Sequence, residues 1–189
     1  MRASMNDVIQ AVFEEFGGRE NFFRESQQQL DYFNRLWDRD TELVGRVLRA
    51  HLVVEHFLTE YIQTTNPRLP SLDDVGISFE AKVRLLPSDV THIQMIVPGI
   101  RQLNRIRNTI AHRLEVEIST EERSSFLGVP VFAAMRNEMK KRNPDLPDAP
   151  IDVLEDFAKL AANWLQGGAD GSSEKWQRAI ARTYPPISD

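Results

Sequence analysis

Apolar side chains recur every three or four positions along most of this chain, a spacing that places them on one face of an α-helix. The first such repeat covers residues 5–16 and stops at Gly17-Gly18, a typical C-terminal stop signal. A second helix is predicted for residues 20–37, and Asp40 is a suitable N-cap for the longest pattern. That stripe consists of Leu43, Val44, Val47, Leu48, Val54, Phe57, Leu58, Tyr61 and Ile62. It predicts a long helix that ends before Asn66-Pro67.

Proline and serine mark shorter elements in the middle of the chain. Residues 66–77 are predicted to form a loop, and residues 78–86 a short helix that Pro87 stops. Ser88 is expected to cap another short helix. Residues 115–118 alternate in polarity, which is consistent with an extended segment or one isolated strand but not with a sheet.

The Pro98-Gly99 pair is expected to break the chain before a helix at residues 100–112, whose apolar face is Leu103, Ile106 and Ile110. Two further helices are predicted, at about 129–141 and 151–165. Residues 167–173 are rich in glycine and serine and predict a flexible linker, followed by a short helix around Trp176.

These elements predict an all-α fold, a bundle of about six to eight helices. We divide the chain into an N-terminal helical arm (1–38), a helical domain (39–166), and a linker with a C-terminal helix (167–189). A chain of 189 residues with 41% hydrophobic residues is long enough for one hydrophobic core and short for two.

Composition narrows the environment and the chemistry. The chain has no cysteine and no apolar run long enough to cross a membrane, so we expect a cytoplasmic protein without a membrane partner. A net charge of −5 argues against general coating of nucleic acid. His51 and His56 are five positions apart, whereas the helical zinc motif needs a spacing of four, and we expect no metal or other cofactor.

Two ionisable residues, His51 and Glu55, fall inside the apolar stripe of the long helix when residues are projected at about 100° each. A carboxylate in that position needs a partner, and Arg107 lies beside the apolar face of the helix at 100–112. We therefore expect Arg107 either to pair with Glu55, to serve a ligand, or to do both. For His51 we expect a hydrogen-bonded core residue that supports this pair.

The segment from Arg101 to Arg113 contains four arginines and no acid within an acidic chain. The spacing of four, three and four aligns Arg101, Arg105, Asn108 and His112 in one row of donors on the face opposite the apolar one. Such a row suits a phosphodiester or a nucleotide phosphate, and the alternative is a solvated helix face balanced by acids elsewhere.

The segment Arg107-Asn108-Thr109-Ile110-Ala111-His112 resembles the Arg-x4-His motif of the HEPN superfamily, with Asn108 in the polar position. The mid-helix acid Glu55 and the stretch Ser78-Phe79-Glu80-Ala81-Lys82-Val83 add a resemblance to its mannitol-repressor-like subgroup. The likeness spans residues 48–112, about 65 of 189. HEPN toxins that pair with a nucleotidyltransferase carry a modified tyrosine two positions after the histidine, where this chain has Leu114.

The resemblance implies an all-α fold and a homodimer in which the Arg and His of two subunits meet. Many members are metal-independent endoribonucleases of toxin or defence type, while others are non-catalytic modules and the mannitol-repressor-like proteins are transcriptional regulators. As a ribonuclease, the chain would use His112 as proton carrier, Arg107 to stabilise phosphate charge and Asn108 to orient the substrate or the imidazole. Arg101 and Arg105 would guide the strand.

An ideal helix places Arg107 and His112 about 140° apart, so one phosphate can reach both only if the helix ends or loosens near His112, or if two subunits share it. We thus carry two functions forward: an RNA-directed protein and candidate endoribonuclease, or a regulatory module with a protein partner. Direct DNA binding is a weaker third, because the chain is acidic and lacks a helix-turn-helix with a basic recognition helix.

Overall fold

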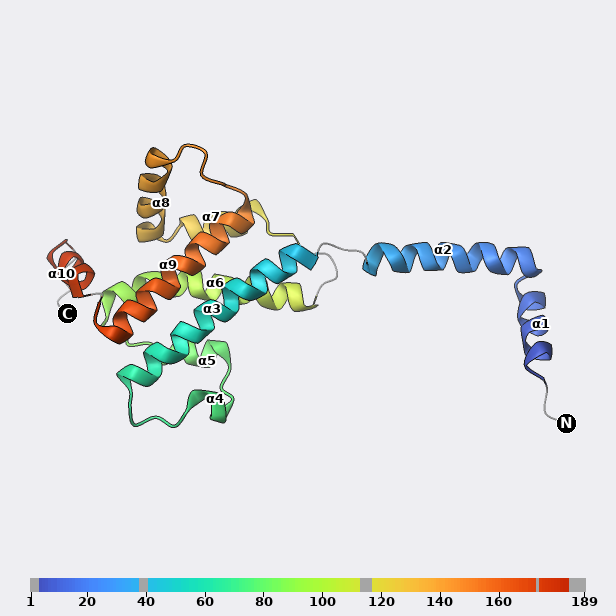
Figure 1. Cartoon of the computed structure of the whole chain (residues 1–189), viewed down its shortest axis with the longest axis horizontal. Coiled ribbons are helices and arrows are strands. Elements are labelled where there is room, and N and C mark those ends of the chain that lie inside the picture. The colour runs from blue at the N-terminus through green and yellow to red at the C-terminus, as the bar shows by residue number, and fades with distance from the viewer. Residues whose placement is uncertain (1–3, 38–40, 113–116, 173, 184–189) are drawn as a thin grey trace. The chain divides into compact units, whose positions relative to one another are not determined.

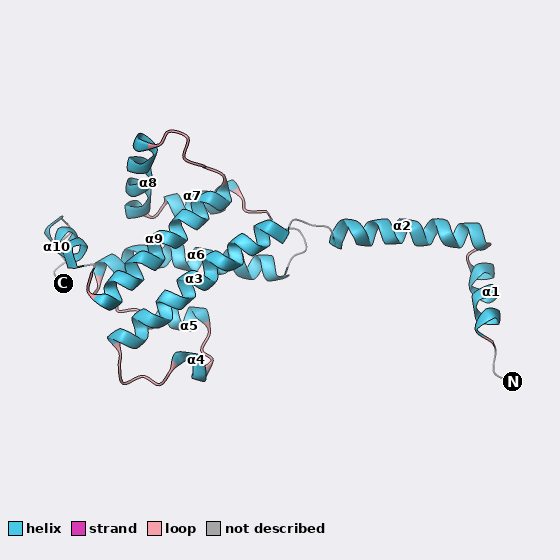
Figure 2. Cartoon of the chain, viewed as in Figure 1, coloured by secondary structure: helices cyan, strands magenta, loops and turns pink. Residues whose placement is uncertain are grey.

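The computed structural model describes residues 4–37, 41–112, 117–172 and 174–183, and every regular element in these ranges is a helix (Figures 1 and 2). Ten helices are present there, eight of them with at least eight residues, so the predicted all-α bundle is confirmed. The chain forms two compact units, residues 1–41 and 42–189, which are described separately. None of the described helices is long and apolar enough to cross a membrane.

The N-terminal unit consists of α1 (Met5–Glu15) and α2 (Arg19–Trp37). Ser4 caps α1 and exchanges hydrogen bonds with Asp7. Gly17 and Gly18 join the helices with φ angles of +70° and +120°, values that residues other than glycine rarely adopt. The phenylalanine rings at this corner contact one another across the two helices; they are Phe13, Phe16, Phe22 and Phe23.

The larger unit contains the remaining eight described helices. They are α3 (Thr41–Thr65), α4 (Leu72–Val75), α5 (Phe79–Arg84), α6 (Thr91–His112), α7 (Thr120–Leu127), α8 (Pro130–Arg142), α9 (Pro150–Asp170) and α10 (Glu174–Thr183). The long helices α3, α6 and α9 supply most of the buried apolar residues. The predicted N-cap Asp40 lies outside the described residues.

Helix α6 runs without interruption through Pro98 and Gly99, so the break that these residues predicted is wrong. The expected short helix after Ser88 is the first turns of this same α6. Gly99 has a different purpose: a Cβ atom there would lie 2.1 Å from the Phe157 ring of α9. Glycine is required because the two helices cross at this point, and the tertiary contact outweighs the local helix-breaking tendency.

Helix α9 continues to Asp170, so residues 167–170 are not part of a flexible linker as we expected. Gly168 packs against the Tyr61 ring, which would lie 2.7 Å from an added Cβ, and the helix ends only at Gly171 with a φ of +77°. The helix predicted around Trp176 is confirmed as α10, and those predicted near 129–141 and 151–165 correspond to α8 and α9.

Helix α7 was not predicted from apolar spacing, because Phe126 is the one residue of this helix that is buried in the core. Its signal is the capping box in which the Ser119 hydroxyl accepts from the Glu122 N–H and the Glu122 carboxylate accepts from the Ser119 N–H. Just before it, Glu117 and Ile118 form no strand, and residues 115 and 116 lie outside the described residues.

Candidate functional site

The outer face of α6 presents hydrogen-bond donors at positions four and three residues apart, as the sequence predicted. Arg101, Arg105 and Asn108 are all exposed. The Arg101 Nε atom lies 3.5 Å from Glu80 Oε1, and the Arg105 Nη1 atom donates to Gln102 Oε1 at 3.2 Å. Each of these contacts occupies one nitrogen of a guanidinium with five N–H donors, so the side chains retain donors for a ligand. We call Arg101, Arg105, Asn108 and His112 the α6 row.

Arg107 and Asn108 form a coupled pair of donors near the end of the helix. The half-buried Arg107 donates from Nη1 to Asn108 Oδ1 at 3.1 Å. Because this bond uses the amide oxygen of Asn108, its remaining polar atoms are the two N–H donors of Nδ2. The pair therefore offers N–H groups of both side chains to an anion.

His112 is the last residue of α6, and its side chain lies outside the described residues. Residues 107–112 are helical throughout, so the helix does not loosen between Arg107 and His112. Five helical positions correspond to about 140° around the axis. A phosphate held by both residues then needs either a change of direction at the helix end or two copies of the chain.

The cation that contacts Glu55 is Lys82 of α5, so pairing with Glu55, one of the two roles that we expected for Arg107, is wrong. Lys82 Nζ donates to Glu55 Oε1 at 2.9 Å, and Lys82 is almost completely buried. The helix α5 brings Lys82 to α3 together with the buried residues Phe79 and Val83. Sequence reasoning missed Lys82, although it follows Phe79 by three positions and therefore lies on the same apolar face.

His51 is a hydrogen-bonded core residue, as we predicted. Its Nε2 atom lies 3.3 Å from Asn104 Oδ1 of α6, its Nδ1 atom lies 3.8 Å from Glu55 Oε2, and its ring packs against Phe79. Burial is the main cause that lowers the pKa of His51, and the positive charges of Arg107 and Lys82 lower it further. The hydrogen bond with Asn104 and the negative charge of Glu55 raise this pKa, but the net direction is downward. The imidazole is therefore neutral at pH 7 and donates from Nε2 to the amide oxygen.

A cavity of about 440 Å³ opens on the side of α3 next to this cluster. Its lining consists of Leu52, Glu55, His56, Thr59, Glu60, Gln63 and Lys82. The two carboxylates outnumber the one buried ammonium, so the cavity is unsuited to a phosphate. Of these two places, the α6 row is the one suited to an anionic ligand.

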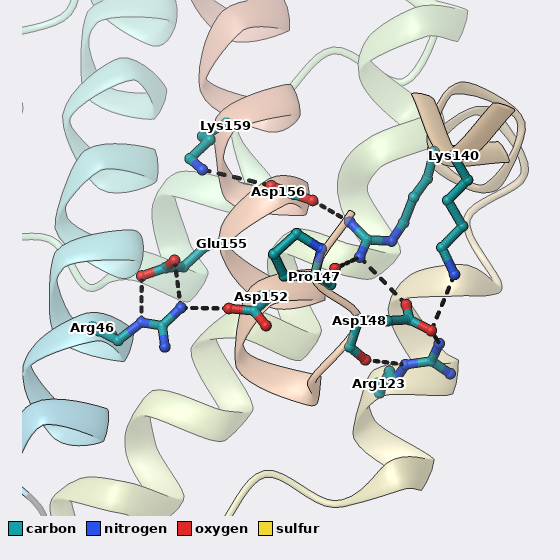
Figure 3. Close-up of polar contacts among 10 residues, drawn as sticks. Arg46, Arg123, Lys140, Pro147, Asp148, Asp152, Glu155, Asp156 and Lys159 are labelled. Atoms are coloured by element: carbon teal, nitrogen blue, oxygen red, sulfur yellow. Dashed lines mark hydrogen bonds and ion pairs between the residues drawn. The ribbon is translucent and has the colours of Figure 1, made fainter. Parts of the chain in front are cut away.

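A different set of arginines holds the helices of this unit together (Figure 3). Arg46 of α3 reaches Asp152 at 2.7 Å and Glu155 at 2.9 Å on α9, and this contact lowers the pKa of Glu155. Arg136 of α8 is buried, and it donates to the Asp156 carboxylate and to the Pro147 carbonyl. We call Arg46 and Arg136 the clasp arginines.

Asp148, in the loop before α9, also contacts the clasp arginine Arg136. Arg123 and Lys140 contact its carboxylate at 2.5 Å and 3.0 Å, and Arg136 lies 3.3 Å away. The bond from Arg123 is the main reason that the pKa of Asp148 is held far below its usual range. Nothing in our sequence reasoning identified this network, because its members come from separate loops and helices.

Within the described parts of the chain, no cluster of three or more histidine, aspartate and glutamate side chains has the arrangement of a metal site. Comparison with known proteins found no family model that matches the chain, and no similar curated protein or solved structure.

Proposed function

We propose that this chain is an RNA-directed protein that acts as a homodimer, and that it is a metal-independent endoribonuclease of the HEPN type, active in toxin or defence systems. The observation that carries the proposal is the Arg107–Asn108 pair. Arg107 bonds to its neighbour Asn108 and not to Glu55, whose carboxylate Lys82 already contacts. The Arg107 guanidinium is therefore spared the fold-holding role that sequence reasoning considered for it.

In this proposal the strand lies along the α6 row with Arg101 and Arg105 on its phosphates. The RNA 2′-oxygen attacks the adjacent phosphorus and loses its proton to a base, while the 5′-oxygen leaves with a proton from an acid. His112 carries these protons, one copy for each transfer, and the N–H donors of Arg107 and Asn108 stabilise the charge on the phosphorane. The products are a 2′,3′-cyclic phosphate and a 5′-hydroxyl end.

The requirement for two histidines explains why the proposal includes a homodimer. Each chain contributes one histidine to the row, and Arg107 and His112 diverge around a continuous helix. A twofold axis that brings two α6 ends together would supply both groups to one phosphate.

The test is incubation of the purified protein with single-stranded RNA in excess EDTA, with cleavage followed by gel and product ends by mass spectrometry. We expect cleavage by the parent and none by His112→Ala. Arg178→Ala removes an exposed arginine of α10 and serves as the matched control with unchanged activity. Equal cleavage by the parent and His112→Ala, or none by either, contradicts the ribonuclease.

A second candidate function is a non-catalytic, mannitol-repressor-like module that regulates transcription through a protein partner. It is favoured by the large apolar side chains that the N-terminal unit exposes, among them Phe23, Phe33 and Trp37. This function predicts no RNA cleavage and capture of a protein partner through the N-terminal unit. Gel shifts on duplex DNA over a salt series separate it from direct DNA binding, which predicts a steep loss of affinity with salt.

A further inference from the structure

Helix α2 carries a continuous seam of positions spaced alternately four and three residues apart. These positions are Arg19, Phe23, Ser26, Leu30, Phe33 and Trp37, and we call them the α2 seam. The spacing spans the whole helix and is that of the a and d positions in a two-stranded coiled coil. Such a seam faces a partner helix when the coiled coil forms.

Most of the α2 seam is exposed to solvent. The exposed fractions are 53% for Phe23, 56% for Phe33 and 74% for Trp37. Within the N-terminal unit, α1 meets α2 near its first turns, where Phe13 contacts Phe22 and Phe23 (Figure 1). Further along, Phe33 and Trp37 stack on each other at 5.7 Å. An exposed row of this kind on one helix indicates an interaction surface.

The charges of α2 limit what can cover the seam. The helix carries three arginines and three acids, so its net charge is zero, and α1 adds Asp7, Glu14 and Glu15. This balance does not suit nucleic acid or an anionic membrane, both of which need an excess of lysine and arginine. The occupant is therefore a neutral apolar surface of a protein.

A second copy of α2 in antiparallel orientation fits the seam position by position. Residues whose numbers sum to 56 then face each other, which sets Phe23 against the partner's Phe33. The same register sets the small Ser26 against the partner's Leu30, and Arg19 against the partner's Trp37. Arg19 already lies over the Phe13 and Phe23 rings at 5.9 and 5.6 Å, so a third ring extends an existing cation–π contact.

The parallel arrangement lacks this complementarity. It would set two Arg19 guanidiniums against each other and leave Ser26 facing Ser26 in the middle of the seam. The positions flanking the seam near its centre, Gln27 and Gln29, are uncharged and so oppose neither orientation. We propose that the α2 seam is covered by α2 of a second copy of this chain in an antiparallel coiled coil, an interface that does not depend on the proposed ribonuclease function.

The first test is the mass of the full chain in solution at micromolar concentrations, measured by sedimentation or light scattering. We expect a dimer. Leu30→Glu places an unpaired charge in the seam and is expected to raise the dissociation constant at least about tenfold. Gln28→Glu adds the same charge on the opposite face of α2 and should leave the mass unchanged.

The antiparallel register makes a specific rescue prediction. Residues 26 and 30 face each other across the two chains, so Ser26→Lys combined with Leu30→Glu creates two ion pairs and should restore the dimer. In a parallel pair the same double variant sets like charges together and would dissociate further. Helix content by circular dichroism separates dissociation from loss of folding.

Disulfide trapping tests the orientation independently, because the chain has no cysteine of its own. An equimolar mixture of Phe23→Cys and Phe33→Cys variants should form the mixed disulfide on mild oxidation. Disulfides between like variants would overturn the antiparallel arrangement. A parent mass of one chain, or a Leu30→Glu variant that stays dimeric, would overturn the interface; the latter result would mean that another surface joins the copies.

Discussion

The arginines of the larger unit fall into two sets that differ in what surrounds them. The clasp arginines, Arg46 and Arg136, contact carboxylates of α9, and Arg136 is 2% exposed. The arginines of α6 meet amides or a single carboxylate at 3.1–3.5 Å; Arg101 and Arg105 are exposed, and Arg107 is half-buried. The same side chain therefore holds helices together in one region and remains available to a ligand in the other.

The partners of an arginine, and not its residue type, therefore separate the structural arginines from the candidate functional ones. A guanidinium enclosed by carboxylates has little charge left to attract an anion, whereas one bonded to a neutral amide keeps its full charge. Substitutions in the two regions should consequently fall into two classes, one that changes stability and one that changes ligand binding.

The largest effect is expected from Arg136→Ala. It leaves Asp156 without its buried partner and should lower the free energy of unfolding by about 3–5 kcal/mol. Urea unfolding followed by circular dichroism measures this change. Lys141→Ala, on the exposed side of the same helix, is the control and should change stability by less than about 0.5 kcal/mol. Equal effects of the two variants would contradict the structural role of Arg136.

The next effect concerns Arg107→Ala, which should leave stability nearly unchanged and reduce RNA cleavage about 100-fold. The reason is that its contact with Asn108 supports no other helix, while a donor to a developing phosphate charge contributes about 3 kcal/mol. Cleavage rates under single-turnover conditions and urea unfolding provide the two measurements. A loss of stability comparable to that of Arg136→Ala would place Arg107 among the clasp arginines.

Acid should weaken the clasps in a predictable range of pH. The lowered pKa values of Glu155 and Asp148 mean that these groups stabilise the fold above their ordinary pKa values of 4.5 and 3.8, and that this stability is lost as the pH falls below them. His51 and His92 have pKa values lowered by burial, so stability begins to fall below their ordinary value of 6.5.

Unfolding free energies measured from pH 8 to pH 3 should thus decline in two stages. Arg46→Ala should diminish only the lower stage, because it removes the main cause of the Glu155 shift. An Arg46→Ala variant with the parent's full loss below pH 4.5 would show that this clasp does not stabilise the fold.

The smallest effect is expected from the double variant Arg101→Ala and Arg105→Ala. These residues are proposed to contact phosphates, so RNA affinity should fall modestly and uniformly over different sequences. The slope of log affinity against log salt should decrease by about 1–2, as one or two fewer counterions are released from a single strand. Filter binding at several salt concentrations measures the slope, and an unchanged slope would remove both residues from the interface.

Most helices of this fold can be predicted from sequence because their apolar residues are buried at helical spacing, as in α3 and α9. Local rules fail where a tertiary contact reverses their meaning. From sequence alone, Gly99 and Gly168 are expected to end a helix. In the structure each makes room for an aromatic ring, that of Phe157 at Gly99 and that of Tyr61 at Gly168. The helix α7 buries too little for its spacing to be informative, and only its capping box could have identified it.

The candidate site shows the same division. The exposure of Arg101, Arg105 and Asn108 follows from their spacing on one helix, and this spacing can be seen in the sequence. The partner of Glu55 does not, because both α5 and α6 carry side chains that contact α3, and the choice between Lys82 and Arg107 depends on how these helices pack. Ion pairs between distant segments, such as Arg123 with Asp148, require knowledge of how the chain folds back.

The crossing at Gly99 also restricts how α6 can respond to a ligand. With the Phe157 ring seated on the bare backbone, a rotation of α6 about its own axis would drive the flanking Pro98 or Ile100 toward that ring. A rotation caused by a ligand at the arginine-bearing end of α6 is therefore not expected to pass Gly99 to the other end of the helix. A bound anion should perturb amide resonances after residue 101 and leave those before residue 97 almost unshifted.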